Sequence, residues 1–256
     1  MSVSLPNVRK LFLPDPDHII FDVDEAGADA QVVAWEADDE ELKAAFRAGL
    51  DVHSFNAEQM MGSRFTSLSS DDPRRKKLRS QNKQGVHGTN YGASARTLAQ
   101  ILGWTVHETE QFQNRWFSAH PGIPAWHRRT EQSLRTTRSV TNKFGYRRIY
   151  FDRVDALLPQ ALAWIPQSTV ALYCFNGMLK VRKSLPEVRL LIQVHDSIVG
   201  QIHRDNFQRT LPKLCDVLHS PIPYDDPLTI PWGLSYSDKS WGHCEKAEWP
   251  QVRMAA

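Results

Sequence analysis

The spacing of apolar and polar residues along the chain predicts a mixture of short strands and helices. Apolar runs predict one strand over residues 18–23 and a pair over residues 189–202, joined by a tight turn at His195-Asp196. Helical spacing predicts helices over residues 38–48, 74–102, 108–119, 124–137 and 166–181. A hairpin is expected over residues 139–151, a polar loop over 63–73, and irregular structure in the proline-rich last forty residues. Because strands and helices do not alternate regularly, an α+β fold is favoured over a parallel doubly wound sheet.

Composition and length limit the class of protein. The 256 residues are enough for one large domain or two small ones, and 41% of them are hydrophobic. No run of about 18 apolar residues occurs, and the N-terminus lacks an apolar signal core, so we expect no membrane span and a cytoplasmic location. The three cysteines form no C-x-x-C pair, so neither a zinc site nor a disulfide framework is expected.

The net charge of +2 conceals separate acidic and basic segments. Acidic residues predominate from Asp15 to Glu58, whereas residues 74–83 (RRKKLRSQNK) hold six cations and no acid. Residues 115–153 hold nine cations and only two acids. This distribution suits a protein that holds a polyanion next to metal ions. Solvated helix faces would give the same pattern, so charge alone does not separate the two interpretations.

Two of the predicted strands carry aspartates among apolar residues. The first reads IIFDVDE and includes Asp22 and Asp24, and the second reads LLIQVHDS and reaches Asp196 at its turn. Two carboxylates from distant segments could share divalent cations, because Mg²⁺ prefers oxygen ligands, and paired metals serve phosphoryl transfer. The alternative is that each aspartate only ends a strand and caps a turn. Since strand side chains alternate with period two, Asp22 and Asp24 share one face, and spacing leaves open which of them acts.

A second candidate site follows one predicted helix. Arg79, Lys83, His87 and Tyr91 recur every four residues and form a ridge about 18 Å long, roughly the reach of a nucleoside triphosphate. Cations suit phosphates, whereas an imidazole and a phenol suit a sugar and a base. Three glycines, at positions 85, 88 and 92, interrupt the same stretch, which indicates close approach of a ligand or backbone, or a helix that moves. A basic surface helix with its aromatic end in the core would show the same spacing.

Short segments between about Leu5 and Gly242 resemble, in order, the motifs of family A DNA polymerases. Asp24, followed by VVAW at 32–35 and GLDVH at 49–53, resembles motif A, and these downstream landmarks favour Asp24 over Asp22. The four-residue ladder followed by Gly92 resembles motif B on the nucleotide-binding fingers helix. The segment KFGYRR at 143–148 resembles the FGRRR segment of the family, QST at 167–169 its QGT segment, and VHD at 194–196 its motif C.

This resemblance implies a metal site and a phosphate site. Asp24 and Asp196, together with the main-chain carbonyl of Glu25, would bind two Mg²⁺ ions. Arg79 and Lys83 would bind the triphosphate, and Lys83 would protonate the pyrophosphate leaving group.

The same resemblance implies contacts to the sugar, the base and the DNA. His87 and Tyr91 would flank the incoming sugar and base, and Asp29 stands where the family has the glutamate that blocks a ribose 2′-hydroxyl. The residues expected along the primer–template are Arg147, Gln167 and His195.

Several positions depart from the family pattern. His87 replaces an aromatic residue, Asp29 is shorter than the usual glutamate, Ser197 replaces the glutamate of an HDE triplet, and Ala163 stands where asparagine is frequent. These departures put sugar discrimination and fidelity in doubt but leave the metal pair intact.

The resemblance predicts an antiparallel-sheet palm (residues 1–62 and 139–256) with an inserted helical fingers subdomain (about 63–138). The expected reaction is attack of a primer 3′-hydroxyl on the α-phosphate of a dNTP. Because motif A begins about twenty residues from Met1, we expect no thumb or proofreading exonuclease in this chain, and a second polypeptide that supplies them.

Two rival functions are less well supported. A non-catalytic nucleic-acid-binding remnant has no need to retain Asp24, Asp196, Arg79 and Lys83 together. A metal-dependent nuclease has no need of a triphosphate ladder, because hydrolysis uses no triphosphate.

Overall fold

The computed structural model describes residues 7–152 and 154–250, without the side chains of residues 154–156. The chain divides into two compact units, the sheet unit (Met1–Ala28 and Thr169–Ala256) and the helical unit (Asp29–Ser168). The palm and fingers subdomains, with predicted boundaries near residues 62 and 139, are defined by function. They are a different division from the two compact units, and their boundaries stay a prediction. None of the described helices is long and apolar enough to cross a membrane.

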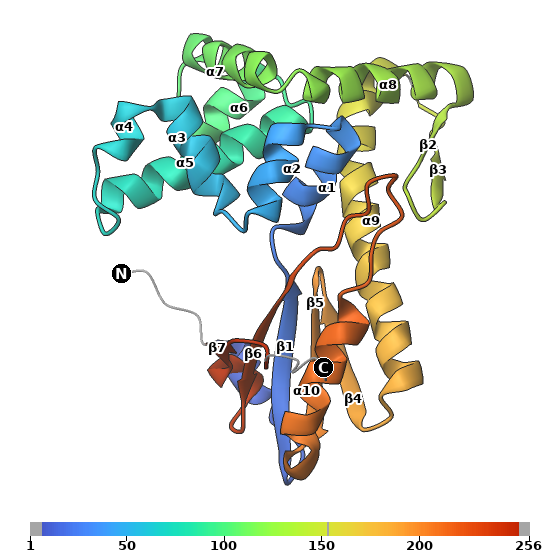
Figure 1. The fold of residues 1–256 in the computed structure, drawn as a ribbon. Helices are drawn as coiled ribbons and strands as arrows, with labels where there is room; N and C mark the ends of the chain where they lie inside the picture. The colour runs from blue at the N-terminus through green and yellow to red at the C-terminus, as the bar shows by residue number, and fades with distance from the viewer. Residues whose placement is uncertain (1–6, 153, 251–256) are drawn as a thin grey trace. The chain divides into compact units, whose positions relative to one another are not determined.

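The sheet unit is built on five antiparallel strands in the order β4-β5-β1-β6-β7 (Figure 1). Their bounds are β1 (His18–Glu25), β4 (Val188–Val194), β5 (Ser197–His203), β6 (Trp232–Ser237) and β7 (Glu245–Ala247). The other elements are η1 (Val8–Leu11), η2 (Trp241–His243), α10 (Arg204–Leu218) and the C-terminal half of α9 (Val154–Ser184). At Gly177 the helix α9 comes so close that an added Cβ would lie 3.1 Å from Leu218 of α10 and 3.8 Å from Trp232 of β6.

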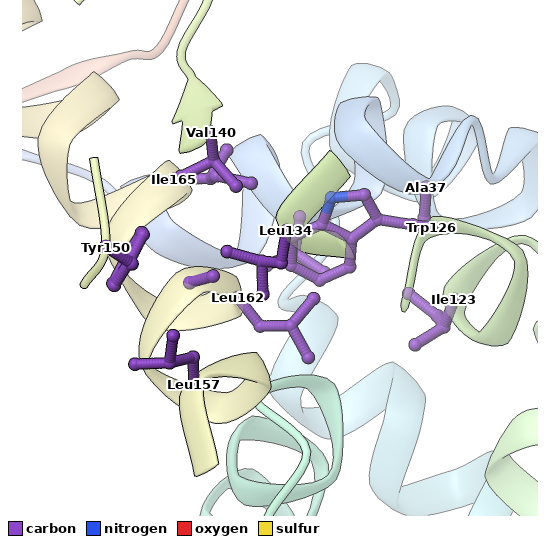
Figure 2. Close-up of a cluster of buried hydrophobic side chains, with 11 residues drawn as sticks. Ala37, Ile123, Trp126, Leu134, Val140, Tyr150, Leu157, Leu162 and Ile165 are labelled. Atoms are coloured by element: carbon purple, nitrogen blue, oxygen red, sulfur yellow. The ribbon is translucent and has the colours of Figure 1, made fainter. Parts of the chain in front are cut away.

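The helical unit contains eight described helices and a short hairpin, with the N-terminal half of α9. The helices are α1 (Ala28–Ala37), α2 (Glu40–Arg47), α3 (Val52–Met61), α4 (Ser63–Thr66), α5 (Pro73–Asn90), α6 (Ala95–Leu102), α7 (Val106–Ala119) and α8 (Gly122–Thr137). The hairpin pairs β2 (Ser139–Thr141) with β3 (Arg147–Ile149). Figure 2 shows the buried cluster that joins α8, the hairpin and α9, in which Trp126, Leu134 and Leu162 pack together.

Two of the three glycines in the predicted ladder helix serve helix packing. A Cβ at Gly85 would lie 3.0 Å from the Phe112 ring of α7, and one at Gly88 would lie 2.8 Å from Leu98 of α6. Gly92 has φ +71° just after α5, a left-handed conformation that favours glycine. The close approach expected at Gly85 and Gly88 is therefore explained by neighbouring helices, without a ligand.

The α+β class with an antiparallel sheet is confirmed, but several predicted elements differ from the observed ones. The 63–73 segment is not only a loop, because it contains α4, and the 74–102 segment is two helices. The helix expected over 166–181 begins at Val154 and includes Pro166, since packing around Leu162 outweighs the helix-breaking tendency of proline. The last forty residues are not wholly irregular, because they supply β6 and β7.

Candidate functional site

Asp24 and Asp196 lie beside each other at one end of the sheet. Asp24 is paired across the sheet with Ser197, the residue that follows Asp196. The amide of Glu25 donates a hydrogen bond of 3.0 Å to the main-chain carbonyl of Asp196, which ties the two segments together. Strand pairing therefore brings together two carboxylates that are 172 residues apart, the difference between 196 and 24.

The hairpin that presents Asp196 has an unusual backbone. His195 has φ +56°, a left-handed conformation that is uncommon outside glycine, although histidine is among the residues that tolerate it. The imidazole Nδ1 lies 3.4 Å from Asp196 Oδ1, and both side chains are exposed. The predicted two-strand turn at His195-Asp196 is thus confirmed.

The electrostatics of this end of the sheet favour a bound cation. Burial, and then the negative charges of Asp22 and Asp196, raise the pKa of Asp24, and Lys246 of β7 only partly opposes them. A carboxylate held beside two others is stabilised by a nearby cation. Among the described residues no three His, Cys, Asp or Glu side chains form a ready metal-binding group.

Small residues leave room around the Asp24 carboxylate. Asp24 is paired with Gly233 of β6 on the side opposite Ser197. A Cβ at Gly233 would lie 2.8 Å from Asp24 Oδ1, so any larger residue would push the carboxylate aside. Gly233 carries no recognisable signal in the sequence, because only the strand register reveals that it faces Asp24.

The two aspartates of β1 differ in their partners. Asp22 Oδ2 accepts a hydrogen bond of 2.6 Å from the Trp241 indole and lies 3.9 Å from the Arg9 guanidinium. The Arg9 guanidinium also lies 4.4 Å from the centre of the Trp241 ring. Oδ2 of Asp22 is thus engaged in packing of the sheet unit, whereas its Oδ1 is buried without a hydrogen-bond partner in the described structure.

In the helical unit, α5 carries the predicted ladder on one face. The rings of His87 and Tyr91 meet edge to face with centroids 4.3 Å apart, and Lys83 is exposed. The stretch begins at an N-cap, where the Asp72 side chain accepts a hydrogen bond from the Arg74 amide, and Pro73 occupies the first turn. Tyr91 is the C-cap residue, so the ladder covers the helix to its end.

Arg79 is held by an internal carboxylate. Its Nε and Nη2 donate hydrogen bonds of 2.9 and 2.7 Å to the two oxygens of Asp51, which precedes α3. Ser54 Oγ donates to Asp51 at 2.7 Å. This bidentate geometry is the one that arginine uses for carboxylate or phosphate, and it holds the pKa of Asp51 well below its usual range. Asp51 was noted in the sequence only as a motif landmark.

His53 joins the ladder from α3. Burial, followed by the charges of Lys83 and Arg79, lowers the pKa of His53 to about 4. A neutral imidazole near two cations is able to donate a hydrogen bond without adding charge. Like Asp51, His53 was visible in the sequence only as part of the GLDVH segment.

Two buried polar groups lie at the end of the ladder. The Tyr91 hydroxyl and Asp29 Oδ1 are buried and interact with each other, and neither has a further hydrogen-bond partner within the described parts of the chain. Burial, and then the charge of Asp29, raise the pKa of Tyr91 well above its usual value. Burial also lowers the pKa of His87, an effect that Asp29 opposes and Lys83 reinforces. Unsatisfied buried groups are costly, so these two mark a place where a polar group of a ligand would bind.

Residues 3–242 match the family model described as DNA polymerase family A. The chain therefore belongs to DNA polymerase family A. The predicted family is thus confirmed over most of the sequence.

Curated DNA polymerases match most of this chain, which spans less than two fifths of the length of each of the two described here. The chain is 31% identical over 236 residues to the thermostable DNA polymerase I of Thermus filiformis, covering 89% of this chain and 28% of that protein. It is 24% identical over 242 residues to the DNA polymerase of Mycobacterium phage D29, covering 94% of this chain and 38% of that protein.

A solved family A structure has the same fold. The POL domain of Pol1 from M. smegmatis, solved with DNA primer-template and dNTP, superposes with a TM-score of 0.79 at 24% identity. The match covers 93% of this chain and 42% of that one.

The predicted metal-binding residues lie in one compact unit, and the predicted nucleotide-binding residues lie in the other. The sheet unit holds the predicted metal ligands Asp24, Glu25 and Asp196, and also His195. The helical unit holds the ladder and Asp29. The roles assigned to all of these residues stay predictions.

Two predicted DNA-binding residues lie in the helical unit. Arg147 on β3 is exposed and donates a 2.9 Å hydrogen bond from Nε to Ser139 Oγ. Gln167 is exposed on α9, and its neighbour Ser168 accepts a 3.0 Å hydrogen bond from Asn142. The Asn142 carboxamide oxygen also accepts hydrogen bonds from the amides of residues 144 and 146. The hydrogen bond between Asn142 and Ser168 therefore fixes the hairpin against α9.

Proposed function

We propose that this chain carries the nucleotidyl-transfer centre of a template-directed DNA polymerase. The observation behind the proposal is the register that puts Asp24 next to Asp196, with mutual charge repulsion and small residues on both sides of Asp24. Asp24, Asp196 and the carbonyl of Glu25 would hold two Mg²⁺ ions. Bound metal would supply electrostatic stabilisation of the attacking and leaving oxygens.

The proposed reaction joins a primer 3′-hydroxyl to the α-phosphate of a dNTP. The 3′-hydroxyl loses its proton to water as its oxygen bonds to the α-phosphorus, the bond from the α-phosphorus to the bridging oxygen breaks, and pyrophosphate leaves. Arg79 would bind the triphosphate with the donors that Asp51 does not use, and Lys83 would give a proton to the pyrophosphate. His53 would donate a hydrogen bond to the same phosphates.

The sugar and base would lie at the other end of the ladder. Tyr91 and His87 would flank them, and the unsatisfied Tyr91 hydroxyl and Asp29 oxygen are suited to polar atoms of the sugar. Asp29 would exclude a ribose 2′-hydroxyl, although its side chain is shorter than that of glutamate. The primer–template would contact Arg147, Gln167 and His195, all of which are exposed.

The test is primer extension with the 256-residue chain, a primed template, dNTPs and Mg²⁺. Extension that needs Mg²⁺ and follows the template sequence supports the proposal. Template binding without extension, at any Mg²⁺ concentration, would instead support the nucleic-acid-binding remnant.

A second polypeptide that supplies thumb and exonuclease stays a prediction. Affinity for duplex DNA depends on the number of neutralised phosphates and falls steeply with salt. We expect short products per binding event from this chain, and longer ones when such a partner is added. Long products at moderate salt from this chain alone would contradict that expectation.

A further inference from the structure

The cationic run at residues 74–83 is larger than the ladder requires. Of its six cations, Arg79 and Lys83 belong to the ladder. Arg75 is fixed by hydrogen bonds of 3.2 and 2.9 Å to the carbonyls of Phe65 and Leu68. Arg74 and Lys77 have no role in the proposed catalytic centre.

These cations lie on the opposite face of α5. An α-helix turns by about 100° per residue, so Arg74 and Lys77 are rotated about the helix axis by about 140–160° from Arg79. The neutral Gln81 lies on the same face as these two cations. They line a hollow of about 500 Å³, whose other walls include Arg64, Leu68 and Trp104. That volume is within the roughly 300–1,000 Å³ of ligand sites.

A second hollow of about 200 Å³ adjoins the first and adds Arg115 to the wall. Both hollows share Arg64, Trp104 and Glu108, and we call them together the Trp104 groove. Four helices contribute to it, namely α3, α4, α5 and α7. The groove is therefore extended, which fits a chain-like ligand better than a compact one.

The charges of the Trp104 groove are mostly uncompensated. No hydrogen bond or ion pair of Arg64, Lys77 or Arg115 is present in the described structure, whereas Arg74 is paired with Asp72. The one acid in the wall, Glu108, accepts hydrogen bonds of 2.8 Å from the amide and hydroxyl of Thr105 in a capping box. Glu108 is thus held at the start of α7, and its charge offsets part of that of Arg64.

Trp104 provides an aromatic surface among these cations. It is half-buried, and the edge-to-face contact with Phe112, with centroids 5.4 Å apart, fixes its ring. A fixed indole next to separated cations is the arrangement that binds single-stranded nucleic acid, in which bases stack on aromatics and phosphates meet cations. A paired duplex hides its base faces and would not use the indole.

We infer that the Trp104 groove binds a single strand of DNA, with a base stacked on Trp104 and phosphates at Arg64, Lys77 and Arg115. This site is separate from the proposed catalytic centre and does not depend on it. It lies on the face of α5 that points away from the ladder.

The first experiment measures binding of a fluorescent oligothymidylate of about 16 nucleotides, without Mg²⁺ or dNTP. The double variant Arg64→Gln/Lys77→Gln should bind about tenfold more weakly. Its slope of log affinity against log salt should fall by about 1.4, since each single-strand phosphate contact contributes about 0.7. The matched control is Lys213→Gln, an exposed lysine of α10 outside the groove. An unchanged affinity and slope in the double variant would overturn the inference.

The second experiment locates the strand. An oligonucleotide with 5-bromodeoxyuridine is irradiated with the protein, and the tryptic peptides are sequenced. The expected cross-link lies in residues 97–115, a peptide in which Trp104 is the only tryptophan. Trp104→Ala should remove it and Trp104→Tyr should retain binding. Cross-links found only in other peptides would refute the site.

The variants also separate this inference from the proposed polymerase function. Asp24→Asn should end primer extension and leave the cross-link at Trp104 unchanged. A chain that extends primers but gives no such cross-link would keep the polymerase proposal and reject the groove.

Discussion

The two units differ in how the charged side chains of their predicted sites are paired. In the sheet unit, Asp24 stands beside Asp22 and Asp196, and the described counter-charges are Lys246, which partly offsets Asp24, and Arg9, which lies 3.9 Å from Asp22. In the helical unit, Arg79 has its own carboxylate in Asp51. The first arrangement needs a cation from outside, whereas the second is already neutralised and oriented. Removing a carboxylate should therefore abolish the function of the first unit but only weaken that of the second.

The largest effect is expected for Asp24→Asn and Asp196→Asn. Each should lower primer extension at least a thousandfold, about 4 kcal/mol, because the remaining ligands hold the metals poorly. Thermal unfolding should show no loss of stability, since Asp24 is exposed, Asp196 is only partly buried, and the two carboxylates repel each other.

Asp22→Asn is the control for this pair of variants. It replaces the charged acceptor of the Trp241 indole by a neutral amide and removes the counter-charge of Arg9, so it should lower the melting temperature while extension remains measurable. Full activity in Asp24→Asn together with loss in Asp22→Asn would transfer the catalytic role to Asp22.

A buried carboxylate of the helical unit should matter more for stability than for chemistry. Asp39 Oδ2 lies 2.9 Å from Nδ1 of His120, and its Oδ1 accepts a 3.0 Å hydrogen bond from the Leu42 amide at the start of α2. Both Asp39 and His120 are buried. Asp39→Ala should cost about 3 kcal/mol of unfolding free energy, since it leaves a buried partner and removes a helix cap.

The same pair predicts a loss of stability in acid. Burial alone would raise the pKa of Asp39, but the hydrogen bonds from His120 and Leu42 lower it below the ordinary value. Its stabilising contribution is therefore complete above about pH 4 and is lost as pH falls through the lower folded pKa. Denaturant titrations from pH 7 to acid should show a difference between wild type and Asp39→Ala that shrinks in acid. A constant difference would contradict this explanation.

Arg79→Ala should have an intermediate effect on catalysis. A charge-assisted hydrogen bond contributes about 1.5–3 kcal/mol, so kcat/KM for dNTP should fall about 10- to 150-fold. DNA affinity measured without dNTP should change little, because the residue is assigned to the triphosphate. Arg96→Ala, an exposed arginine of α6, is the matched control. Equal kinetics in Arg79→Ala and wild type would remove the ladder from the mechanism.

Much of the fold and of the candidate site was predictable from local sequence. The strand pair around His195-Asp196 and the antiparallel sheet were predictable, because short apolar runs and turn residues specify them locally. The proline-containing start of α9 was not, because packing around Leu162 decides it. Gly233 and the Asp51–Arg79 pair depend on strand register and on contacts between α3 and α5, which no spacing along the chain encodes.

The smallest effect, and the sharpest test of the comparison, is expected for Asp51→Asn. Asparagine has nearly the same shape and still accepts one hydrogen bond from Arg79, but it lacks the charge that holds both nitrogens. The pair is half exposed, so the melting temperature should barely change. Because Arg79 becomes less well oriented, KM for dNTP should rise about three- to tenfold while kcat changes less, a difference of about 1 kcal/mol. Asp51→Glu should restore part of the loss, and Ser54→Ala, which removes a neutral partner shared by Asp51 and Arg79, should have a smaller effect than Asp51→Asn. A lower KM in Asp51→Asn would reverse the assignment, because Asp51 would then compete with the triphosphate for Arg79 instead of positioning Arg79 for it.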